Sequence, residues 1–268
     1  MLRTFLITTA LAACVAAGAA QSRNRESART GTTGCDDYRS DDRASFCEVR
    51  EDTIGGANPL DLDSGGNGGI RVHGWDRGDV LVRTRVVASA NTDDEARRVA
   101  SAVRLETGGG RIRATGPEPT ANEHWSVGFE LFVPRAAMLT LNTRNGGISL
   151  EDFRGSAEFH TQNGGLSLAR VGGNLRGTTT NGGVAVDLDG DHWDGAGLDL
   201  ETRNGGIRVS MPGNYSAEVE AGTTRGGLNV DFPVAERGQR HVTATLGAGG
   251  PKIRTITTNG GVTIRRRP

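Results

Sequence analysis

Lysine, aromatic residues and cysteine are all scarce in this chain of 268 residues. A single lysine, Lys252, stands among 31 basic residues, and arginine supplies the others. Seven Phe, three Trp and two Tyr leave few side chains that could stack on sugar rings. With 32 acidic residues the formal net charge is −1. No basic excess attracts the chain to nucleic acid, which we therefore exclude as a partner.

The short motifs of several enzyme classes are missing as well. The chain has no Gly-x-Ser-x-Gly elbow and no phosphate-binding loop. Its histidines show no His-x-x-x-His spacing, so we predict neither a zinc site nor a cofactor. The five histidines are His73, His124, His160, His192 and His241.

Long apolar runs are limited to the N-terminus. Met1-Leu2-Arg3 precedes an apolar run from Phe5 to Val15, which predicts a signal peptide over residues 1–20. The segment Leu11-Ala12-Ala13-Cys14 also resembles a bacterial lipobox, which would put a lipid anchor on Cys14. Both alternatives predict export. No other segment is apolar over the length that a membrane span requires.

The cysteines support this prediction of export. Either kind of processing leaves Cys35 and Cys47 as the only pair of free thiols. Because exported chains meet an oxidising compartment, we predict a Cys35–Cys47 disulfide. Residues 21–46 are predicted to form a flexible leader that contains the cysteine loop.

One motif, Thr-x-Asn-Gly-Gly followed by an aliphatic residue, dominates the second half of the chain. It occurs six times, once with Arg225 in place of Asn. Repeats of about 20 residues around a Gly-rich corner are typical of a solenoid. We expect the glycines to supply the positive φ of a sharp corner. The predicted structural corners are Asn145-Gly146-Gly147, Asn163-Gly164-Gly165, Asn181-Gly182-Gly183, Asn204-Gly205-Gly206 and Asn259-Gly260-Gly261.

Apolar and polar residues alternate on both sides of each corner, as in Leu139-Thr140-Leu141 and Ile148-Ser149-Leu150. This period predicts two short strands per turn, each with one buried face. The fold class is therefore all-β, with solenoid repeats over residues 136–268. Stacked turns would align Asn and Thr in columns. A flat binding array is one interpretation of these columns, but turn chemistry alone explains the residue types, so we assign them a structural role.

Residues 47–135 are predicted to form a smaller β-rich region with one helix. Thr92 followed by Asp93-Asp94-Glu95 forms a capping box at the start of the helix. We expect the helix to cover apolar surface at the mouth of the solenoid or along one face. Its apolar face is Ala96, Val99, Ala100 and Val103, and the expected strands lie at 69–72, 80–87, 105–114 and 125–133.

Three features in this order resemble a known family. They are the run from Asn67 to Val82, the Asp-Asp-Glu-Ala helix, and Phe129-Glu-Leu-Phe-Val-Pro leading into the Asn-Gly-Gly repeats. Together they resemble the bacterial putative-adhesin family of exported β-strand-repeat proteins, a domain of unknown function, over residues 47–264. The resemblance implies a right-handed β-helix-like fold and an extracytoplasmic location in the periplasm, at the outer membrane or in the medium. It implies no catalytic residues.

An acidic segment is a candidate calcium site. Alternate carboxylates at Asp187, Asp189, Asp191 and Asp194 could converge on a hard cation. However, His192 stands where an EF-hand loop has glycine, and Leu198 where it has the bidentate acid. A solvated acidic loop is the simpler interpretation.

Two functions fit these patterns. We predict a non-catalytic scaffold or adhesin-like protein that binds an envelope component, protein or glycan. The alternative is a β-helix enzyme that acts on polysaccharides. It would use Asp199 and Glu220, which consecutive repeats would place on neighbouring turns as a carboxylate pair. The mixed charges around them also fit a solvent face held by ion pairs.

The chain ends in Arg265-Arg266-Arg267-Pro268. These residues directly follow the last repeat, and we predict that they cap the last turn of the stack and block end-to-end pairing of its open edge. A basic tail that binds anionic lipid is the alternative interpretation.

Overall fold

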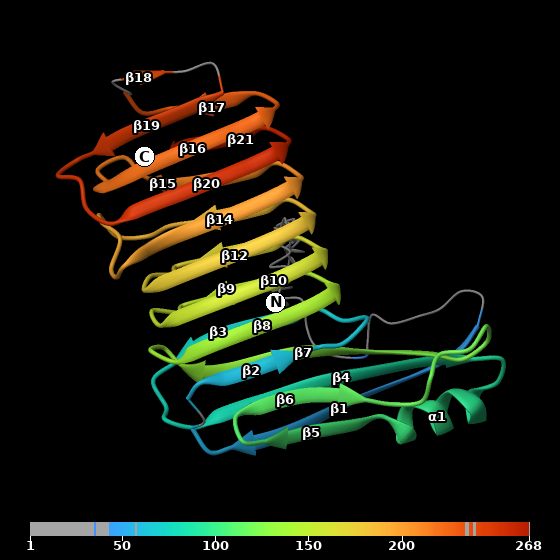
Figure 1. The fold of residues 1–268 in the computed structure, drawn as a ribbon. Helices are drawn as coiled ribbons and strands as arrows, with labels where there is room; N and C mark the ends of the chain where they lie inside the picture. Colours follow the sequence, from blue (N-terminus) through green and yellow to red (C-terminus); the bar gives the residue numbers. More distant parts are fainter. Residues whose placement is uncertain (1–34, 36–42, 57, 234–235, 238–239, 268) are drawn as a thin grey trace, which may run out of the picture. The chain divides into compact units, whose positions relative to one another are not determined.

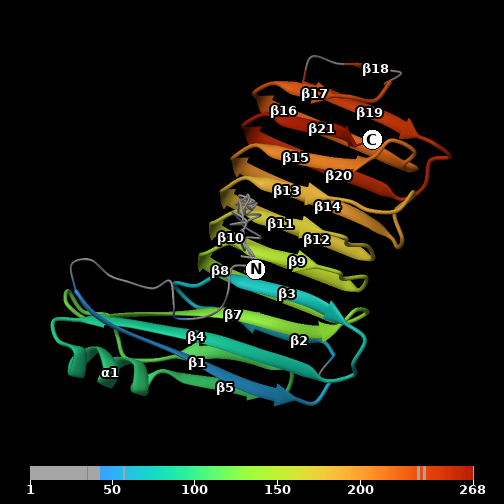
Figure 2. The same cartoon turned by 180° about the vertical axis from the view of Figure 1, so that it is seen from behind.

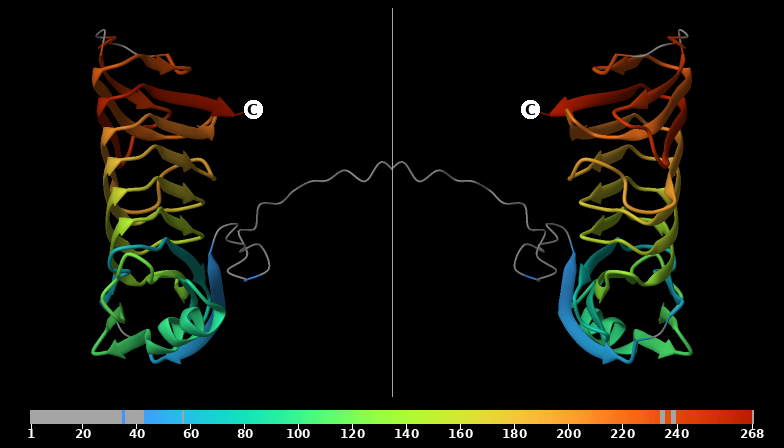
Figure 3. Two further views of the ribbon diagram at one scale, coloured as in Figure 1. Left: turned by 90° about the vertical axis from the view of Figure 1, so that its right-hand side faces the viewer. Right: turned by 90° about the vertical axis from the view of Figure 1, so that its left-hand side faces the viewer.

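The fold consists almost entirely of β-strands, as predicted. The computed structural model describes residue 35 and residues 43–56, 58–233, 236–237 and 240–267. Within these residues the strands form a ten-stranded and an eleven-stranded sheet, and one helix accompanies them (Figures 1 and 2). Figure 3 shows from the side how the two sheets face each other across the core.

Both sheets run the length of the stack. The strands of the ten-stranded sheet are, in order across it, β1 (Ala44–Ile54), β4 (Val80–Ala90), β7 (His124–Pro134), β3 (Ile70–Trp75), β9 (Ile148–Glu151), β11 (Leu166–Ala169), β13 (Val184–Asp187), β15 (Ile207–Pro212), β21 (Val262–Arg267) and β17 (Leu228–Val230). Those of the eleven-stranded sheet are β18 (Glu236–Arg237), β19 (His241–Leu246), β16 (Ala217–Arg225), β20 (Lys252–Asn259), β14 (Gly197–Asn204), β12 (Asn174–Asn181), β10 (Ser156–Asn163), β8 (Met138–Asn145), β2 (Leu60–Asp63), β6 (Arg111–Thr115) and β5 (Arg104–Gly108).

The repeating unit is a rung, which we define as one strand of the eleven-stranded sheet, a Gly-rich corner and the next strand of the ten-stranded sheet. In the middle of the stack the rungs β8/β9, β10/β11, β12/β13 and β14/β15 follow one another in sequence and pair in parallel. Apolar residues point inward at every second position, so each strand buries one face. Two short strands per turn are therefore observed as predicted.

At both ends of the stack the spatial order departs from the sequence order. The last rung in the sequence, β20/β21, lies between β14/β15 and β16/β17. Likewise, β2/β3 lies between β6/β7 and β8/β9. Both sheets thus continue through residues 135–136, where the sequence placed a boundary. The expectation that consecutive repeats occupy neighbouring turns is wrong at these places.

The pairing chemistry explains how such insertion occurs. The rungs β8/β9, β10/β11, β12/β13, β14/β15 and β20/β21 present the same backbone and Asn-Gly-Gly groups to their neighbours, so the corner motif alone does not determine which of them pair. After β16 and β17 the chain continues to β19, which pairs antiparallel along the outer edge of β16. It then returns on the inner side of β16 as β20, in parallel.

The C-terminal arginines do not cap the stack. Ser210, Met211 and Pro212 of β15 lie opposite Arg265, Arg266 and Arg267 of β21. The Arg267 guanidinium is 2.8 Å from an Asp187 carboxylate oxygen and donates to the Leu188 carbonyl oxygen. The capping hypothesis is wrong because β21 lies inside its sheet, whose edge at this end is β17.

The helix α1 (Asp93–Ala102) starts at the predicted capping box, where Thr92 and Glu95 bond each other's backbone N–H. It buries Ala96, Val99 and Ala100 and packs mainly against β4 and β1. The prediction that it covers apolar surface is confirmed.

One inward position in the core is occupied by a hydroxyl. Thr255 in β20 is fully buried, and its Oγ1 has no hydrogen-bond partner among the described residues. The neighbouring strand β14 has Leu200 at this level. A buried polar group without a partner costs about 1–3 kcal/mol.

Replacing Thr255 with the isosteric valine should therefore raise the free energy of unfolding by about 1 kcal/mol. Denaturant unfolding measures this change. The control is Thr257→Val two residues later, because the Thr257 hydroxyl donates to the Gly205 carbonyl oxygen at 2.8 Å and its loss should destabilise. Stabilisation by both variants, or by neither, would contradict this assignment.

The Cys35–Cys47 disulfide is present, as predicted, and ties residue 35 to β1. The predicted signal peptide, the lipobox at Cys14 and most of the leader lie outside the described residues. Within the described part of the chain, no helix is long and apolar enough to cross a membrane.

Candidate functional site: the outer faces of the two sheets

The corner asparagines form a ladder along the stack. Each Nδ2 donates to the Oδ1 of the preceding rung at 2.8–2.9 Å. Arg225 ends the column, with its guanidinium 3.5 Å from the Asn259 Oδ1. The column runs in the order Asn67, Asn145, Asn163, Asn181, Asn204, Asn259 and Arg225. These amides bond one another, which fits the structural role assigned from the sequence.

A second ladder holds the corner glycines. The inward Thr of each rung donates its hydroxyl to the first corner glycine of the neighbouring rung at 2.7–2.9 Å. At Gly164 and Gly182 the backbone φ lies outside the left-handed region, so positive φ is not why glycine stands there. A Cβ on either would lie 2.0 Å from the carbonyl oxygen of the adjacent rung. Close approach of the backbones, rather than φ, requires glycine at these positions.

The outer face of the eleven-stranded sheet carries a column of alternating charge. Arg254 lies between Asp199 and Glu220, because β20 is inserted between β14 and β16. Its guanidinium is 2.6 Å from an Asp199 oxygen, 2.5 Å from Glu201 and 3.8 Å from Glu220. The predicted carboxylate pair on neighbouring turns is therefore wrong, since an arginine separates the two acids.

Ion pairing shifts the pKa values in this column. Burial alone would raise the pKa of the Glu220 carboxyl, but hydrogen bonds from His241 and Lys252 hold it below its usual range. Burial would lower the pKa of Arg254, but hydrogen bonds to Glu201 and Asp199 raise it. The Glu220 carboxylate is thus held ionised and paired, a state suited to a stable surface rather than to proton transfer.

Three of the four aspartates of the candidate calcium site have separate side-chain partners. Asp187 pairs with Arg267 at 2.8 Å, Asp189 lies 3.5 Å from Arg154, and Asp191 lies 2.6 Å from His192. The Asp194 backbone carbonyl accepts from the Gly173 N–H at 2.6 Å. No group of three or more His, Cys, Asp or Glu side chains among the described residues could hold a metal ion.

The turns that follow β9 and β11 are joined by a strong ion pair between Asp152 and Arg170. Arg170 donates twice to the Asp152 carboxylate, both at 2.8 Å, and this hydrogen bonding holds the pKa of Asp152 below its usual range. Both residues have positive φ, of 55° for Asp152 and 52° for Arg170. The pair joins two successive rungs at equivalent positions.

Two of the hollows formed by the described residues of the stack include neither Asp199 nor Glu220. The first, of about 390 Å³, follows the corners of the ten-stranded sheet and is lined by Gly183, Val184, Ala185, Gly206, Ile207, Arg208, Gly261 and Thr263. The second, of about 340 Å³, includes Tyr215, Phe232 and Leu246. Neither contains a constellation of acids or nucleophiles.

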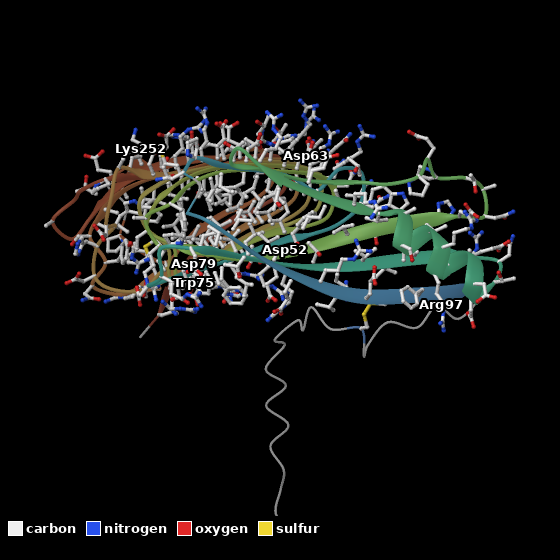
Figure 4. The ribbon with its side chains drawn as sticks, turned by 90° about the horizontal axis from the view of Figure 1, so that it is seen from below. Asp52, Asp63, Trp75, Asp79, Arg97 and Lys252 are labelled. Carbon is white, nitrogen blue, oxygen red and sulfur yellow. A yellow bond between two sulfur atoms is a disulfide. The ribbon has the colours of Figure 1, made fainter. Side chains whose placement is uncertain are left out.

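The outer face of the ten-stranded sheet carries an aromatic–arginine cluster, which we define as His73, Trp75, Arg77, Arg83 and Phe132. The rings of His73 and Phe132 stack with centroids 5.0 Å apart, and Trp75 lies 5.6 Å from Phe132. Arg77 covers the Trp75 ring at 4.3 Å, and Arg83 lies 5.7 Å from Phe132. In Figure 4, Trp75 lies on the opposite side of the molecule from Lys252 and Asp63.

Two acidic side chains, Glu130 and Glu151, lie next to this cluster. Glu130, whose side chain is only 11% exposed, lies 2.8 Å from Arg83 and 3.4 Å from His73. His73 also approaches Glu151 at 3.7 Å. His73, Arg83 and Phe132 thus lie on paired strands of the sheet, where contacts with Glu130 and between the rings hold them in place, as a binding surface requires.

This cluster was not predicted from the sequence. The sequence contains one signal of the cluster. His73, Trp75 and Phe132 occupy outward positions on two strands that each bury one face, and polar residues are expected at such positions. Recognising it also required the pairing of β3 with β7, which sets His73 opposite Phe132 although the two are distant in the sequence.

The chain is similar to a known protein family and to several solved structures. The family model described as Toastrack DUF4097 matches residues 66–265. The search of curated proteins gave no match. Among solved structures, a putative cell adhesion protein from Clostridium sporogenes is 14% identical, with 83% of this chain and 100% of that chain covered and a TM-score of 0.43. A putative adhesin from Bacteroides fragilis is 10% identical, with 82% and 97% covered and a TM-score of 0.38. A putative lipid binding protein from Parabacteroides distasonis is 12% identical, with 82% and 96% covered and a TM-score of 0.30.

Proposed function

The chain belongs to the Toastrack DUF4097 family, and we propose that it is an exported, non-catalytic scaffold that binds a component of the bacterial cell envelope. This family is the putative-adhesin family that the sequence resembles. We also propose that the chain coils in a right-handed direction, as in a β-helix. The path of the chain in a crystal structure would test this handedness.

The observation that carries the proposal is the aromatic–arginine cluster. Aromatic rings and arginine are the residues enriched where proteins bind partners, because they offer large rigid contact areas and directed hydrogen bonds. Here Arg77 is 62% exposed and lies over the Trp75 ring. Guanidinium groups that stack on rings favour carboxylate or phosphate groups, so an acidic envelope glycan or protein is the expected partner.

The state of the acids on the other face supports a non-catalytic role. Asp199 of β14 and Glu220 of β16 are separated by Arg254 of β20, which forms ion pairs with both acids. Glycoside hydrolysis needs two carboxylates that flank a bound sugar, one of them protonated.

We also propose that the protein is located outside the cytoplasm. The Cys35–Cys47 disulfide supports it, because such bonds persist in oxidising compartments. Whether the chain is released by a signal peptidase or anchored through Cys14 is tested by mass spectrometry of the mature N-terminus.

Replacing Arg77 with glutamate should reduce binding to envelope fractions at least about fivefold, because it reverses the charge over the ring cluster. The measurement is a pull-down with purified protein, run in parallel on alginate as an acidic polysaccharide and on phosphatidylglycerol vesicles. Arg77 is itself exposed and lies against the surface side chains of Trp75 and Asp79, so the fold should be unaffected.

The matched control is Arg98→Glu on α1. Arg98 is 64% exposed and pairs with one acid, Glu123, as Arg77 pairs with Asp79. Binding that both variants lose equally would show general charge attraction. Binding that neither loses would contradict the cluster as the site.

A further inference from the structure

The strand β1 forms a long open edge of the ten-stranded sheet. It runs for 11 residues and pairs with β4 along its whole length. In the described part of the chain no strand pairs with its other side. The other sheet ends are short, with 5 residues in β5, 3 in β17 and 2 in β18.

Such an edge presents unpaired N–H and C=O groups that can pair with another strand. Native edges are commonly blocked by proline, by charged side chains or by a covering segment. The strand β1 contains no proline, and its charged residues are Glu48, Arg50, Glu51 and Asp52. Its central residue, Val49, is 41% exposed. Only one other large hydrophobic residue of the described chain, Met138 at 46%, is so exposed.

We propose that two copies of this chain associate through β1, edge to edge and antiparallel, about a two-fold axis at Val49. In this register residue 44 faces residue 54 of the second copy, so all 11 residues pair. Glu48 faces Arg50 of the second copy, and Arg50 faces Glu48. The two Val49 side chains meet at the axis.

Charge selects this register from the alternatives. A two-fold axis perpendicular to the sheet must lie midway between the two copies of one β1 residue, because directly opposite residues share a face of the sheet. Centring on Glu48 would place Glu48 opposite its own copy. Centring on Arg50 would place the two arginines opposite each other and Glu48 opposite Asp52. Like charges directly opposite destabilise a sheet.

The charged groups are already held at this edge. The Arg50 guanidinium bonds Glu48 in the same strand and donates to the carbonyl oxygens of Val103 at 2.8 Å and Ala100 at 3.0 Å, at the end of α1. The Cys47 disulfide lies close to Val49 on the same strand. Because these side chains are ordered before pairing, little entropy is lost when a second copy binds.

The test is the oligomeric state of the purified protein by sedimentation velocity at about 100 µM, above the dissociation constant expected of a small interface. Wild-type protein should form dimers. Val49→Lys places two ammonium groups at the axis and should raise the dissociation constant at least about tenfold. Met138→Lys, on β8, is the matched control and should dimerise as the wild type does.

A charge reversal supplies a second test. Glu48→Arg should weaken the dimer, because an arginine at this position would face Arg50 of the second copy. Circular dichroism checks that each variant is folded. A wild type that is monomeric at this concentration would overturn the proposal. So would a dimer that persists in the Val49→Lys variant, since another surface would then hold it.

Discussion

Replacing Gly182 with alanine should lower the free energy of unfolding by about 4 kcal/mol. The new Cβ would lie 2.0 Å from the Gly164 carbonyl oxygen, far inside van der Waals contact. That oxygen also accepts the Thr179 hydroxyl at 2.8 Å. The Gly164 N–H bonds the Asn181 carbonyl oxygen at 2.9 Å, which fixes the spacing of the two rungs. Relief of the clash must therefore break hydrogen bonds of the corner.

The next residue provides the matched control. A Cβ on Gly183 would lie 3.5 Å from the Gly206 carbonyl oxygen, an ordinary contact. Gly183→Ala should therefore cost less than about 1 kcal/mol. Thermal and denaturant unfolding of the two variants measure the difference. Equal and small losses at both positions would show that close approach is not the reason for glycine at the corner.

The repeat pattern was sufficient to predict the strands and the columns of Asn and Thr, although positive φ is not the reason for glycine at Gly164 and Gly182. Period-two alternation depends only on which residues are apolar, and the corner motif carries its own turn chemistry, so both are local properties of the sequence. The helix was equally local, because Thr92 and Glu95 lie within one turn. The disulfide followed from the small number of cysteines.

The order of the rungs could not be predicted in this way. Asn204 and Asn259 belong to rungs with the same edge chemistry, and the rung of Arg225 differs from them only in its corner side chain. The motif therefore does not determine which rung pairs with which. The insertion of β20 depends on β19, which pairs antiparallel with β16 and turns the chain back. That pairing joins residues distant in the sequence, and no local pattern indicates it.

The same limit applies to the candidate site. The separation of Asp199 from Glu220 and the meeting of Trp75 with Phe132 both follow from strand order rather than from strand identity. The sequence showed which side chains point outward. It did not show which of them are neighbours.

Deleting residues 252–268 should unfold the end of the stack. It removes the buried side chains of Ile253, Val262 and Ile264, each worth about 2 kcal/mol. It also leaves β16 and β17 without the rung that joins them to β14 and β15. The total is comparable to the stability of a whole domain, about 5–15 kcal/mol.

The most direct measurement of the rung order is amide hydrogen exchange of this truncated chain, compared with the full chain. If β20/β21 lies inside the stack, the amides of β16 and β17 should lose their protection, whereas those of β8 to β13 should keep it. If β16 and β17 stay protected as in the full chain, β20/β21 is not the rung that holds them on the stack, and the inserted position of the C-terminal rung is contradicted.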